Sequence, residues 1–204
     1  MVKKHSIIIL SIISLILLMV IGVNIRASEE GILFDEKIMK YVHNRTTPIG
    51  IEIMKKISFF GSAKFFLSLG LIIFLFMFWK KNLEGMALVV LSTLGSYGVN
   101  FLLKNIFVRT RPLKYFLIEQ GGYSFPIGHA MVSMSFYATM TYLIMKNKDK
   151  NKKTLWILSF LIIALIGFSR IYLGVHWPTD VLSGYIMGFL MYIIIITIYE
   201  RQTK

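Results

Sequence analysis

Near its C-terminal end the chain reads SRIYLGVHWPTD over residues 169–180, where two long apolar runs meet. Each run is long enough to cross a bilayer as a helix, which takes about 20 largely apolar residues. A turn between two such helices would hold Arg170, His176 and Asp180 together at one edge of the membrane. Charged residues beside membrane helices are costly and tend to be functional, so this turn is the first candidate for a site.

The rest of the chain has the composition of a membrane protein. Of its 204 residues, 56% are hydrophobic, the mean hydropathy is +0.68, and the apolar residues are gathered in long blocks. These blocks lack the alternation of barrel strands. We therefore predict one all-α domain over residues 1–204, an integral membrane bundle of six transmembrane helices: Ser6–Ile25, Ile57–Trp79, Leu83–Val108, His129–Met145, Leu155–Val175 and Pro178–Tyr199.

Lys and Arg residues in short loops predict the orientation, because such loops stay in the cytoplasm. With six spans, both termini and the loops after the second and fourth spans share one side, which carries Lys3, Lys4, Lys80, Lys81, Lys146, Lys148, Lys150, Lys152, Lys153, Arg201 and Lys204. The opposite side balances its cations with acids over residues 26–56. We predict a multi-pass cell-membrane protein with cytoplasmic termini and the 169–180 turn facing outside the cytoplasm.

Two N-terminal segments allow two interpretations each. The first apolar run resembles a signal peptide, but it is long for one and residues 25–27 form a poor cleavage site, which favours an uncleaved helix. Residues 31–45 have apolar residues at helical spacing, namely Phe34, Ile38, Tyr41 and Val42. They predict a short helix that either lies in the membrane interface or packs as a cap on the bundle.

The net charge of +13 does not indicate a nucleic-acid partner. The basic residues are spread over loops between apolar segments and form no single stripe, so anionic lipid head groups of the bilayer are the simpler partner. The chain has no cysteine, which excludes disulfides and thiolate metal sites.

A second polar cluster reads KNIFVRTRP over residues 104–112 and also ends an apolar run. Lys104 and Arg111 are about two turns apart, so they share one face if the helix continues, although Pro112 limits how far it runs. Arginine binds phosphate oxygens bidentately and lysine adds a point charge. The alternative is a basic collar that contacts lipid head groups.

A third cluster reads FPIGH over residues 125–129 and precedes an apolar run. It places Gly128 and His129 at the start of a helix, where unpaired backbone N–H groups attract anions. Glycine lets a phosphate approach the backbone closely, and His129 could protonate a leaving oxygen beside it. The alternative is a histidine that caps the helix.

The 169–180 turn has the most specific spacing of the three. Pro178 is at a favoured position to open a helix, and Asp180 is four residues after His176. A hydrogen bond from one ring nitrogen to that carboxylate would leave the other nitrogen free to attack. The alternative is a His–Asp cap on a tight turn. Three cations, two histidines and one carboxylate on one membrane face together indicate phosphoryl transfer.

In order and spacing, the clusters resemble the type 2 phosphatidic acid phosphatase superfamily, whose signature is K-x6-RP, PSGH and SR-x5-H-x3-D. The resemblance implies that His176 forms a phosphohistidine, Asp180 orients it, and His129 protonates the leaving lipid oxygen and then activates water. It implies that Lys104, Arg111, Arg170, Gly128 and position 127 bind the phosphate. The cations take the place of a metal, so we predict no metal and no other cofactor.

One position departs from this signature, because Ile127 stands where the family has serine. The hydroxyl would be a direct phosphate donor, and the bulkier isoleucine could crowd the site. The backbone N–H and Gly128 remain, so we expect reduced but nonzero activity.

The resemblance implies metal-independent hydrolysis of phosphatidylglycerophosphate, undecaprenyl diphosphate or phosphatidic acid at the outer face. The short outer loops predict broad specificity. The alternative is a catalytically weakened membrane protein that binds or moves lipid phosphates, with Ile127 marking the decay. Six membrane helices argue against the vanadate chemistry of the family's soluble relatives. None of these features indicates an oligomeric state.

Overall fold

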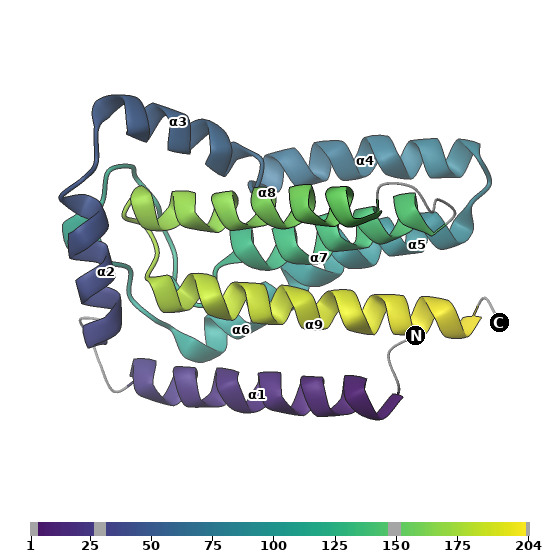
Figure 1. Cartoon of the computed structure of the whole chain (residues 1–204), viewed down its shortest axis with the longest axis horizontal. Helices are drawn as coiled ribbons and strands as arrows, with labels where there is room; N and C mark the ends of the chain where they lie inside the picture. The colour runs from purple at the N-terminus through teal and green to yellow at the C-terminus, as the bar shows by residue number, and fades with distance from the viewer. Residues whose placement is uncertain (1–3, 27–31, 147–151, 203–204) are drawn as a thin grey trace.

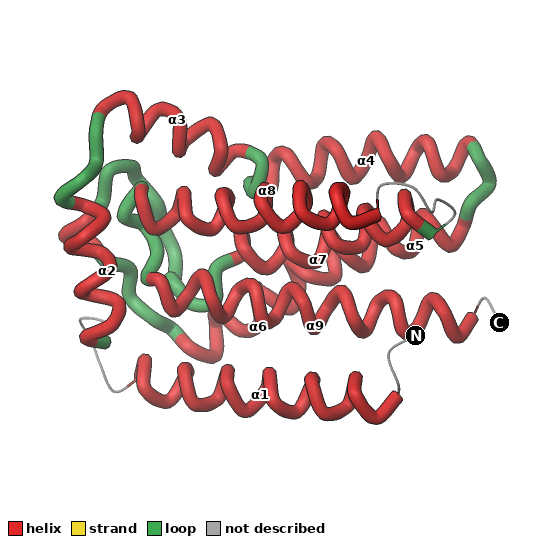
Figure 2. Tube along the Cα trace, in the orientation of Figure 1, coloured by secondary structure: helices red, strands yellow, loops and turns green. Residues whose placement is uncertain are grey.

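The computed structural model describes residues 4–26, 32–146 and 152–202, and within them the chain is entirely helical (Figures 1 and 2). The elements, in chain order, are α1 (Lys4–Arg26), α2 (Leu33–His43), α3 (Pro48–Phe59), α4 (Ala63–Trp79), α5 (Leu83–Val90), a π-helical turn (Leu91–Gly95), α6 (Ser96–Phe107), a 3₁₀ turn (Leu113–Tyr115), α7 (Gly128–Met145), α8 (Lys152–Tyr172) and α9 (Pro178–Gln202). The predicted all-α class is confirmed for these residues.

Four of the helical stretches are long and apolar enough to cross a membrane: Pro48–Trp79, Leu83–Phe107, Lys152–Tyr172 and Pro178–Arg201. Helix α7 is not among them. It lies inside the bundle with ten of its residues buried, including Ser133, Ser135, Thr139 and Thr141. A helix enclosed by protein need not be apolar on every side. Helix α1 runs beside the bundle next to α9 (Figure 1).

The stretch Pro48–Trp79 begins earlier than the second predicted helix, which was expected to start at Ile57. Two helices, α3 and α4, follow one another with a short turn between them, and each begins at a hydroxyl cap. The side chain of Thr47 accepts a hydrogen bond from the Gly50 N–H, and that of Ser62 accepts one from the Phe65 N–H. Such caps satisfy backbone donors that have no partner inside the helix, which is why two helices form where the apolar pattern indicated one.

The predicted helix Leu83–Val108 is interrupted by the π-helical turn Leu91–Gly95. Inside this turn Thr93 donates its hydroxyl to the Val89 carbonyl, at 2.6 Å. The helix ends at Phe107, because Val108 takes a left-handed conformation with φ of 48°. The helix therefore does not continue to Arg111, so the condition under which Lys104 and Arg111 would share one helix face is not met.

Close contact between α7 and α9 forms the centre of the bundle. Gly184 and Gly188 of α9 lie one turn apart, and a Cβ at Gly188 would collide with the Met131 carbonyl oxygen of α7. A Cβ at Gly184 would come within 2.9 Å of the Ala130 side chain. Small residues four apart let two helix backbones touch in a membrane bundle. The glycines therefore set how α7 and α9 are positioned against each other.

The two ends of the bundle differ. Helix α1 begins and α9 ends at one end, and the loops that carry the polar clusters gather at the other (Figure 1). The cations at positions 3, 148, 150 and 204, on which the predicted orientation partly rests, lie outside the described residues, as does Ala27 of the cleavage motif.

Helix α2 crosses the end of the bundle that carries the clusters and packs against α8 and α9 (Figure 1). It buries Asp35 and Met39, while two residues of the predicted apolar stripe are turned outward, with Phe34 49% and Tyr41 61% exposed, and the other two, Ile38 and Val42, are half-buried. The helix predicted within residues 31–45 is present and caps the bundle. Its outward apolar residues also fit an interfacial position.

Candidate active site

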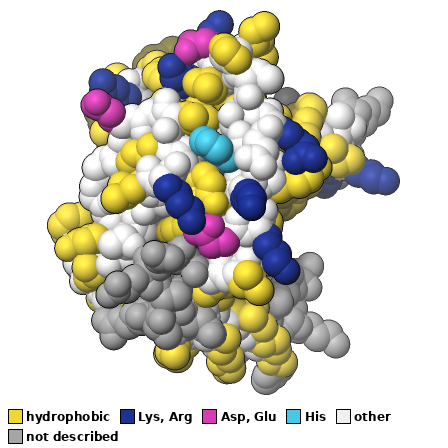
Figure 3. Space-filling model, turned by 90° about the vertical axis from the view of Figure 1, so that its left-hand side faces the viewer, with side chains coloured by type: hydrophobic (Ala, Val, Ile, Leu, Met, Phe, Trp, Pro, Cys, Tyr) yellow, Lys and Arg dark blue, Asp and Glu magenta, His cyan; other side chains and the backbone are white. Residues whose placement is uncertain are grey.

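A cavity of about 180 Å³ opens at this end, between the loops and the helix ends. Viewed from this end, the surface carries Lys, Arg, Asp and Glu side chains among apolar ones (Figure 3). Six of the eight predicted site residues line the cavity, together with four that sequence reasoning did not single out. The lining residues are Lys104, Arg111, Gly128, His129, Arg170, His176, Ala63, Tyr97, Asn100 and Gln120.

Arg111 reaches the cavity from the loop after α6 and is held there by backbone carbonyls. Its guanidinium donates to the carbonyl oxygens of Val175 at 2.7 Å, Gly122 at 2.8 Å and Tyr123 at 3.1 Å. Lys104 donates to the same Tyr123 carbonyl at 2.6 Å. Burial lowers the pKa of Arg111 to about 10, so the side chain stays protonated at neutral pH.

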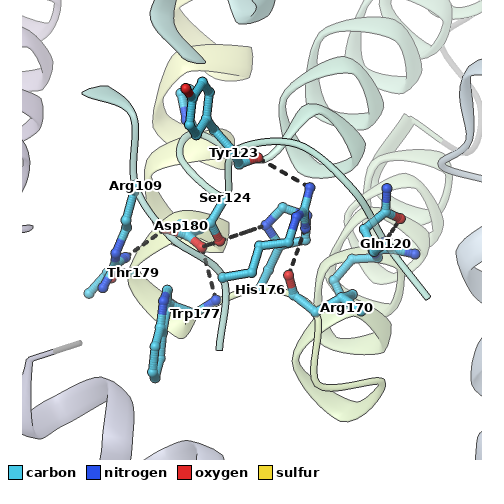
Figure 4. A network of polar contacts seen from close by, with 12 residues as sticks. Arg109, Gln120, Tyr123, Ser124, Arg170, His176, Trp177, Thr179 and Asp180 are labelled. Atoms are coloured by element: carbon cyan, nitrogen blue, oxygen red, sulfur yellow. Dashed lines mark hydrogen bonds and ion pairs between the residues drawn. The ribbon is translucent and has the colours of Figure 1, made fainter. Parts of the chain in front are cut away.

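Arg170 is 3% exposed and enters the cavity from the end of α8. It donates to the Ser58 hydroxyl at 2.6 Å. It also donates to the Gln120 side-chain oxygen at 2.7 Å (Figure 4). Both partners are neutral, so the charge of Arg170 is oriented by the protein but is not neutralised by an acid. A cation in this state is suited to bind an anionic ligand.

The turn that presents His176 depends on Gly174. This glycine has a φ of 73°, and a Cβ there would collide with the Tyr115 carbonyl oxygen. The Leu117 N–H donates to the Leu173 carbonyl at 3.1 Å, which pairs the turn with the loop after α6. Only glycine combines this backbone conformation with so close an approach.

His176 is 2% exposed, and its two ring nitrogens have different neighbours. Nε2 lies 2.8 Å from an Arg111 nitrogen beside the cavity. Nδ1 lies 3.3 Å from the Ser124 hydroxyl and 3.5 Å from an Asp180 oxygen (Figure 4). Burial lowers the pKa of His176 well below its usual range, and the nearby Arg111, Arg170 and Lys104 lower it further. The ring is therefore neutral at pH 7.

The Asp180 carboxylate is fully buried and strongly held. One oxygen accepts from Arg109 at 2.6 Å, and the other accepts from the Trp177 N–H at 2.9 Å and from the Ser124 hydroxyl. The predicted contact between Asp180 and His176 is present as an approach of 3.5 Å, with the Ser124 hydroxyl bonded to the carboxylate and lying close to the ring.

Arg109 joins this carboxylate to helix α2. It donates to Asp35 at 2.7 Å and to the Thr179 hydroxyl at 2.8 Å, and Asp35 also accepts from the Thr179 N–H at 2.9 Å. Sequence reasoning missed Arg109, Asp35 and Ser124. Arg109 lies inside the second cluster and Ser124 directly precedes the third, so proximity was the available signal. Asp35 carried none, because it resembled a surface acid.

Helix α7 begins at Gly128, as predicted, and Asn100 positions its start. The Asn100 amide donates to the Pro126 carbonyl at 3.0 Å, and a Cβ at Gly128 would come within 3.0 Å of the Asn100 side-chain oxygen. His129 lines the cavity from the first turn. Both imidazoles thus face the same space.

The Ile127 side chain does not line the cavity. It is fully buried in an apolar cluster with Ala130 and Val181 and lies against Gly184. The expected crowding of the phosphate site by isoleucine is therefore not present in this structure.

The arrangement has an excess of positive charge. Lys104, Arg111 and Arg170 face the cavity, while Arg109 is balanced by the buried Asp35 and Asp180. A small cavity with three oriented cations and two imidazoles can bind a phosphoryl group and exchange protons with it. In the described part of the chain, no group of three or more His, Asp or Glu side chains is placed to hold a metal ion.

Comparison with known proteins agrees with this chemistry. The chain is 35% identical over 166 residues to phosphatidylglycerophosphatase B of Bacillus subtilis, covering 79% of this chain and 81% of that protein. It is 25% identical over 180 residues to an undecaprenyl-diphosphatase of Sulfolobus acidocaldarius, covering 85% of this chain and 82% of that protein.

Among solved structures, the transmembrane PAP2-type phosphatidylglycerolphosphate phosphatase of Bacillus subtilis superposes with a TM-score of 0.81 at 30% identity, covering 91% of this chain and 96% of that one. LpxE of Aquifex aeolicus shares the fold, with a TM-score of 0.67 at 22% identity over 82% of this chain and 98% of that one. The family model for the PAP2 superfamily matches residues 85–204, so this chain belongs to the PAP2 superfamily of phosphatases.

Proposed function

We propose that this protein removes the phosphate or diphosphate group from membrane lipids by metal-independent hydrolysis through a phosphohistidine. The observation that carries the proposal is the cavity that joins three cations with the Nε2 side of a neutral, buried His176. A neutral imidazole can act as a nucleophile without first losing a proton.

In the proposed first step, Nε2 of His176 attacks phosphorus and the bond from phosphorus to the lipid oxygen breaks. His129 gives its proton to that oxygen, and Lys104, Arg111 and Arg170 stabilise the charge on the other phosphate oxygens. In the second step, His129 takes a proton from water, the water oxygen bonds to phosphorus, and the phosphorus–nitrogen bond breaks. Each fixed donor of this kind contributes on the order of 10²–10³ in rate.

An apolar groove supports a lipid substrate. It has a volume of about 410 Å³ and runs between α4 and the stretch from α5 through the π-helical turn, with Phe66, Leu71, Val89 and Leu94 in its walls. Phe66 is one turn along α4 from Ala63, which lines the polar cavity. We propose that the hydrocarbon chain occupies this groove while the phosphate occupies the cavity.

We further propose a single domain with six membrane spans, with α1 and α7 as the two that hydropathy leaves out. The termini would then be cytoplasmic and the cavity would open outside the cytoplasm. Support comes from the Lys-rich loop ends Lys80, Lys81, Lys146 and Lys152, which share the end of the bundle opposite the cavity (Figure 1).

For substrates, the names of the relatives favour phosphatidylglycerophosphate and undecaprenyl diphosphate, with phosphatidic acid as a third candidate. The loops around the cavity are short, so we propose broad specificity. A preference of more than about a thousandfold for one lipid, or about 4 kcal/mol, would contradict it.

The test is phosphate release by purified protein in detergent with EDTA, from those three lipids. His176→Ala should abolish release, and His43→Ala is the matched control, because His43 lies at the same end of the bundle but not in the cavity. With a substrate whose phosphate is labelled, retention of the phosphate label on His176 after quenching without acid would identify the phosphohistidine.

Release that requires added metal, or that survives in His176→Ala, would contradict the mechanism. No release from any of the lipids, with phosphate binding intact, would favour a protein that binds or moves lipid phosphates.

A further inference from the structure

Ser124 is a fully buried residue near the end of the loop that joins α6 to α7. Its backbone N–H donates to the Arg109 carbonyl at 2.9 Å, which fixes the position of the residue. Its hydroxyl contacts two groups of the site, the Asp180 carboxylate and Nδ1 of His176 (Figure 4). The side chain does not line the cavity, so it would not contact a phosphate held there.

The directions of these hydrogen bonds follow from the chemistry of the partners. A guanidinium only donates, so Nε2 of His176, which lies 2.8 Å from Arg111, must be the unprotonated nitrogen. The neutral ring then carries its proton on Nδ1. An ionised carboxylate only accepts, so the Ser124 hydroxyl donates its hydrogen to Asp180. The hydroxyl oxygen is left to accept from Nδ1, at 3.3 Å.

The carboxylate cannot readily move to replace this contact. Arg109 holds one oxygen at 2.6 Å and the Trp177 N–H holds the other at 2.9 Å. Arg109 is itself tied to Asp35. The distance of 3.5 Å from Nδ1 to the carboxylate is longer than an ordinary N–H···O hydrogen bond.

We propose that Ser124 is a positioning residue for the nucleophile, which links Nδ1–H of His176 to the Asp180 carboxylate. The inference rests on the proposed function of His176. The hydroxyl keeps the ring proton on Nδ1 and leaves the Nε2 lone pair on the cavity side of the ring, beside Arg111. When Nε2 bonds to phosphorus, the ring gains positive charge and its proton stays on Nδ1. The chain of hydroxyl and carboxylate then stabilises that charge.

The variant that tests this is Ser124→Ala, with Ser183→Ala as the matched control. Ser183 is also fully buried and lies on α9 one turn from Asp180, and its hydroxyl makes no hydrogen bond to the described residues. We expect Ser124→Ala to lower kcat by about 10- to 10²-fold, the range for losing one hydrogen bond to a charged group. KM should stay within about twofold, because the cavity wall is unchanged, and Ser124→Thr should restore part of kcat.

A second readout does not depend on turnover. In protein labelled with ¹⁵N at its four histidines, the His176 signals are those missing from His176→Ala. We expect a protonated Nδ1 and a bare Nε2 in the wild type, and a mixture of the two tautomers in Ser124→Ala. Ser124→Cys, which is similar in size but bonds weakly, replaces Ser124→Ala if the latter does not fold.

The outcomes separate the two proposals. Wild-type kcat and an unchanged tautomer in Ser124→Ala would show that Asp180 contacts the ring directly, and would overturn the role of Ser124. A protonated Nε2 in the wild type would overturn it as well. A wild type that releases no phosphate from any lipid would instead contradict the proposed function, while the ¹⁵N signals would still report on Ser124.

Discussion

The two histidines of the cavity sit in very different surroundings. His176 is 2% exposed and backed by buried polar groups that extend through Ser124 and Asp180 to Arg109 and Asp35. His129 projects from the first turn of α7, whose start rests on an apolar cluster and one amide contact. One ring is fixed by hydrogen bonds and the other by the helix that carries it.

This difference matches the two proposed roles. A nucleophile attacks once, along one direction, so its orientation and its tautomer must both be fixed. A general acid that later acts as a base must lose and regain a proton. Strong partners would hold it in a single protonation state. The comparison therefore predicts different responses when each side is altered.

The largest effect is expected on the His129 side. His129→Ala should lower the release of phosphate from lipids by about 10²–10⁴-fold, since protonation of the leaving oxygen is lost. With p-nitrophenyl phosphate, whose leaving group needs no proton, labelled His176 should still form and should persist because hydrolysis is slowed. His43→Ala is the control. Failure to label His176 in His129→Ala would mean that both rings are needed for attack. It would contradict the division of roles between the two histidines.

Arg109→Met should weaken the His176 side without touching the cavity. It leaves Asp35 and Asp180 buried without their cation, and breaking a buried pair in this way costs about 3–5 kcal/mol. The melting temperature in detergent should fall clearly, and kcat should fall by a larger factor than KM rises. The matched control is Arg45→Met, since Arg45 is exposed and stacks on Tyr41. Equal melting temperatures for both variants would show that the ion pairs of Arg109 with Asp35 and Asp180 do not stabilise the His176 side of the site.

The dependence of kcat/KM on pH should report the protonation states of the two rings. Burial and three nearby cations depress the pKa of His176, so the ring stays neutral as the pH falls past its ordinary value of about 6.5. The acid limb of kcat/KM should therefore lie below pH 6.5, and the whole profile should be bell-shaped. In the same range the unfolded chain binds a proton that the folded chain does not, so stability falls as the pH drops. An acid limb above pH 6.5 would contradict the assignment.

The smallest effect on activity is expected at Ile127. Because its side chain points into the apolar cluster, Ile127→Ser should change kcat/KM far less than the 10²-fold or so that a direct phosphate donor provides. It should instead lower the melting temperature, since a buried apolar side chain is lost. A large rise in kcat/KM would show that the serine hydroxyl reaches the phosphate, and would restore the expectation of a weakened enzyme.

Much of the fold was accessible from sequence because it depends on local pattern. Apolar runs marked the helices, and Gly128 and Pro178 marked two helix starts, which the structure confirms. The Asp35 contacts were not accessible, because they join residues 74 and 144 positions apart. Hydrophobic periodicity indicated the helix α2 but did not indicate that Asp35 is buried on it. Beside a bilayer, apolar residues can face lipid, and the polar Asp35 faces the protein.

The loop after α6 explains another limit. The two cations of the second cluster would share one helix face only if the helix continued, but left-handed Val108 ends the helix between them. Pro112 limited how far the helix could run, but a β-branched residue rarely takes a left-handed conformation, so the end at Val108 was not indicated. Both side chains reach the cavity nonetheless, because loop carbonyls bind them from the far side.

The π-helical turn Leu91–Gly95 acts as a one-residue insertion in the helical stretch that carries Lys104 and ends at Phe107. A π-turn adds one residue to the helical repeat, and one residue corresponds to about 100° of rotation. Deleting a single residue there would restore a regular helix and leave every contact of α5 in place. It would also swing Tyr97, Asn100 and Lys104 by about that angle, away from the cavity. The register of one helical turn in mid-span thus decides whether this helix contributes to the phosphate site at all.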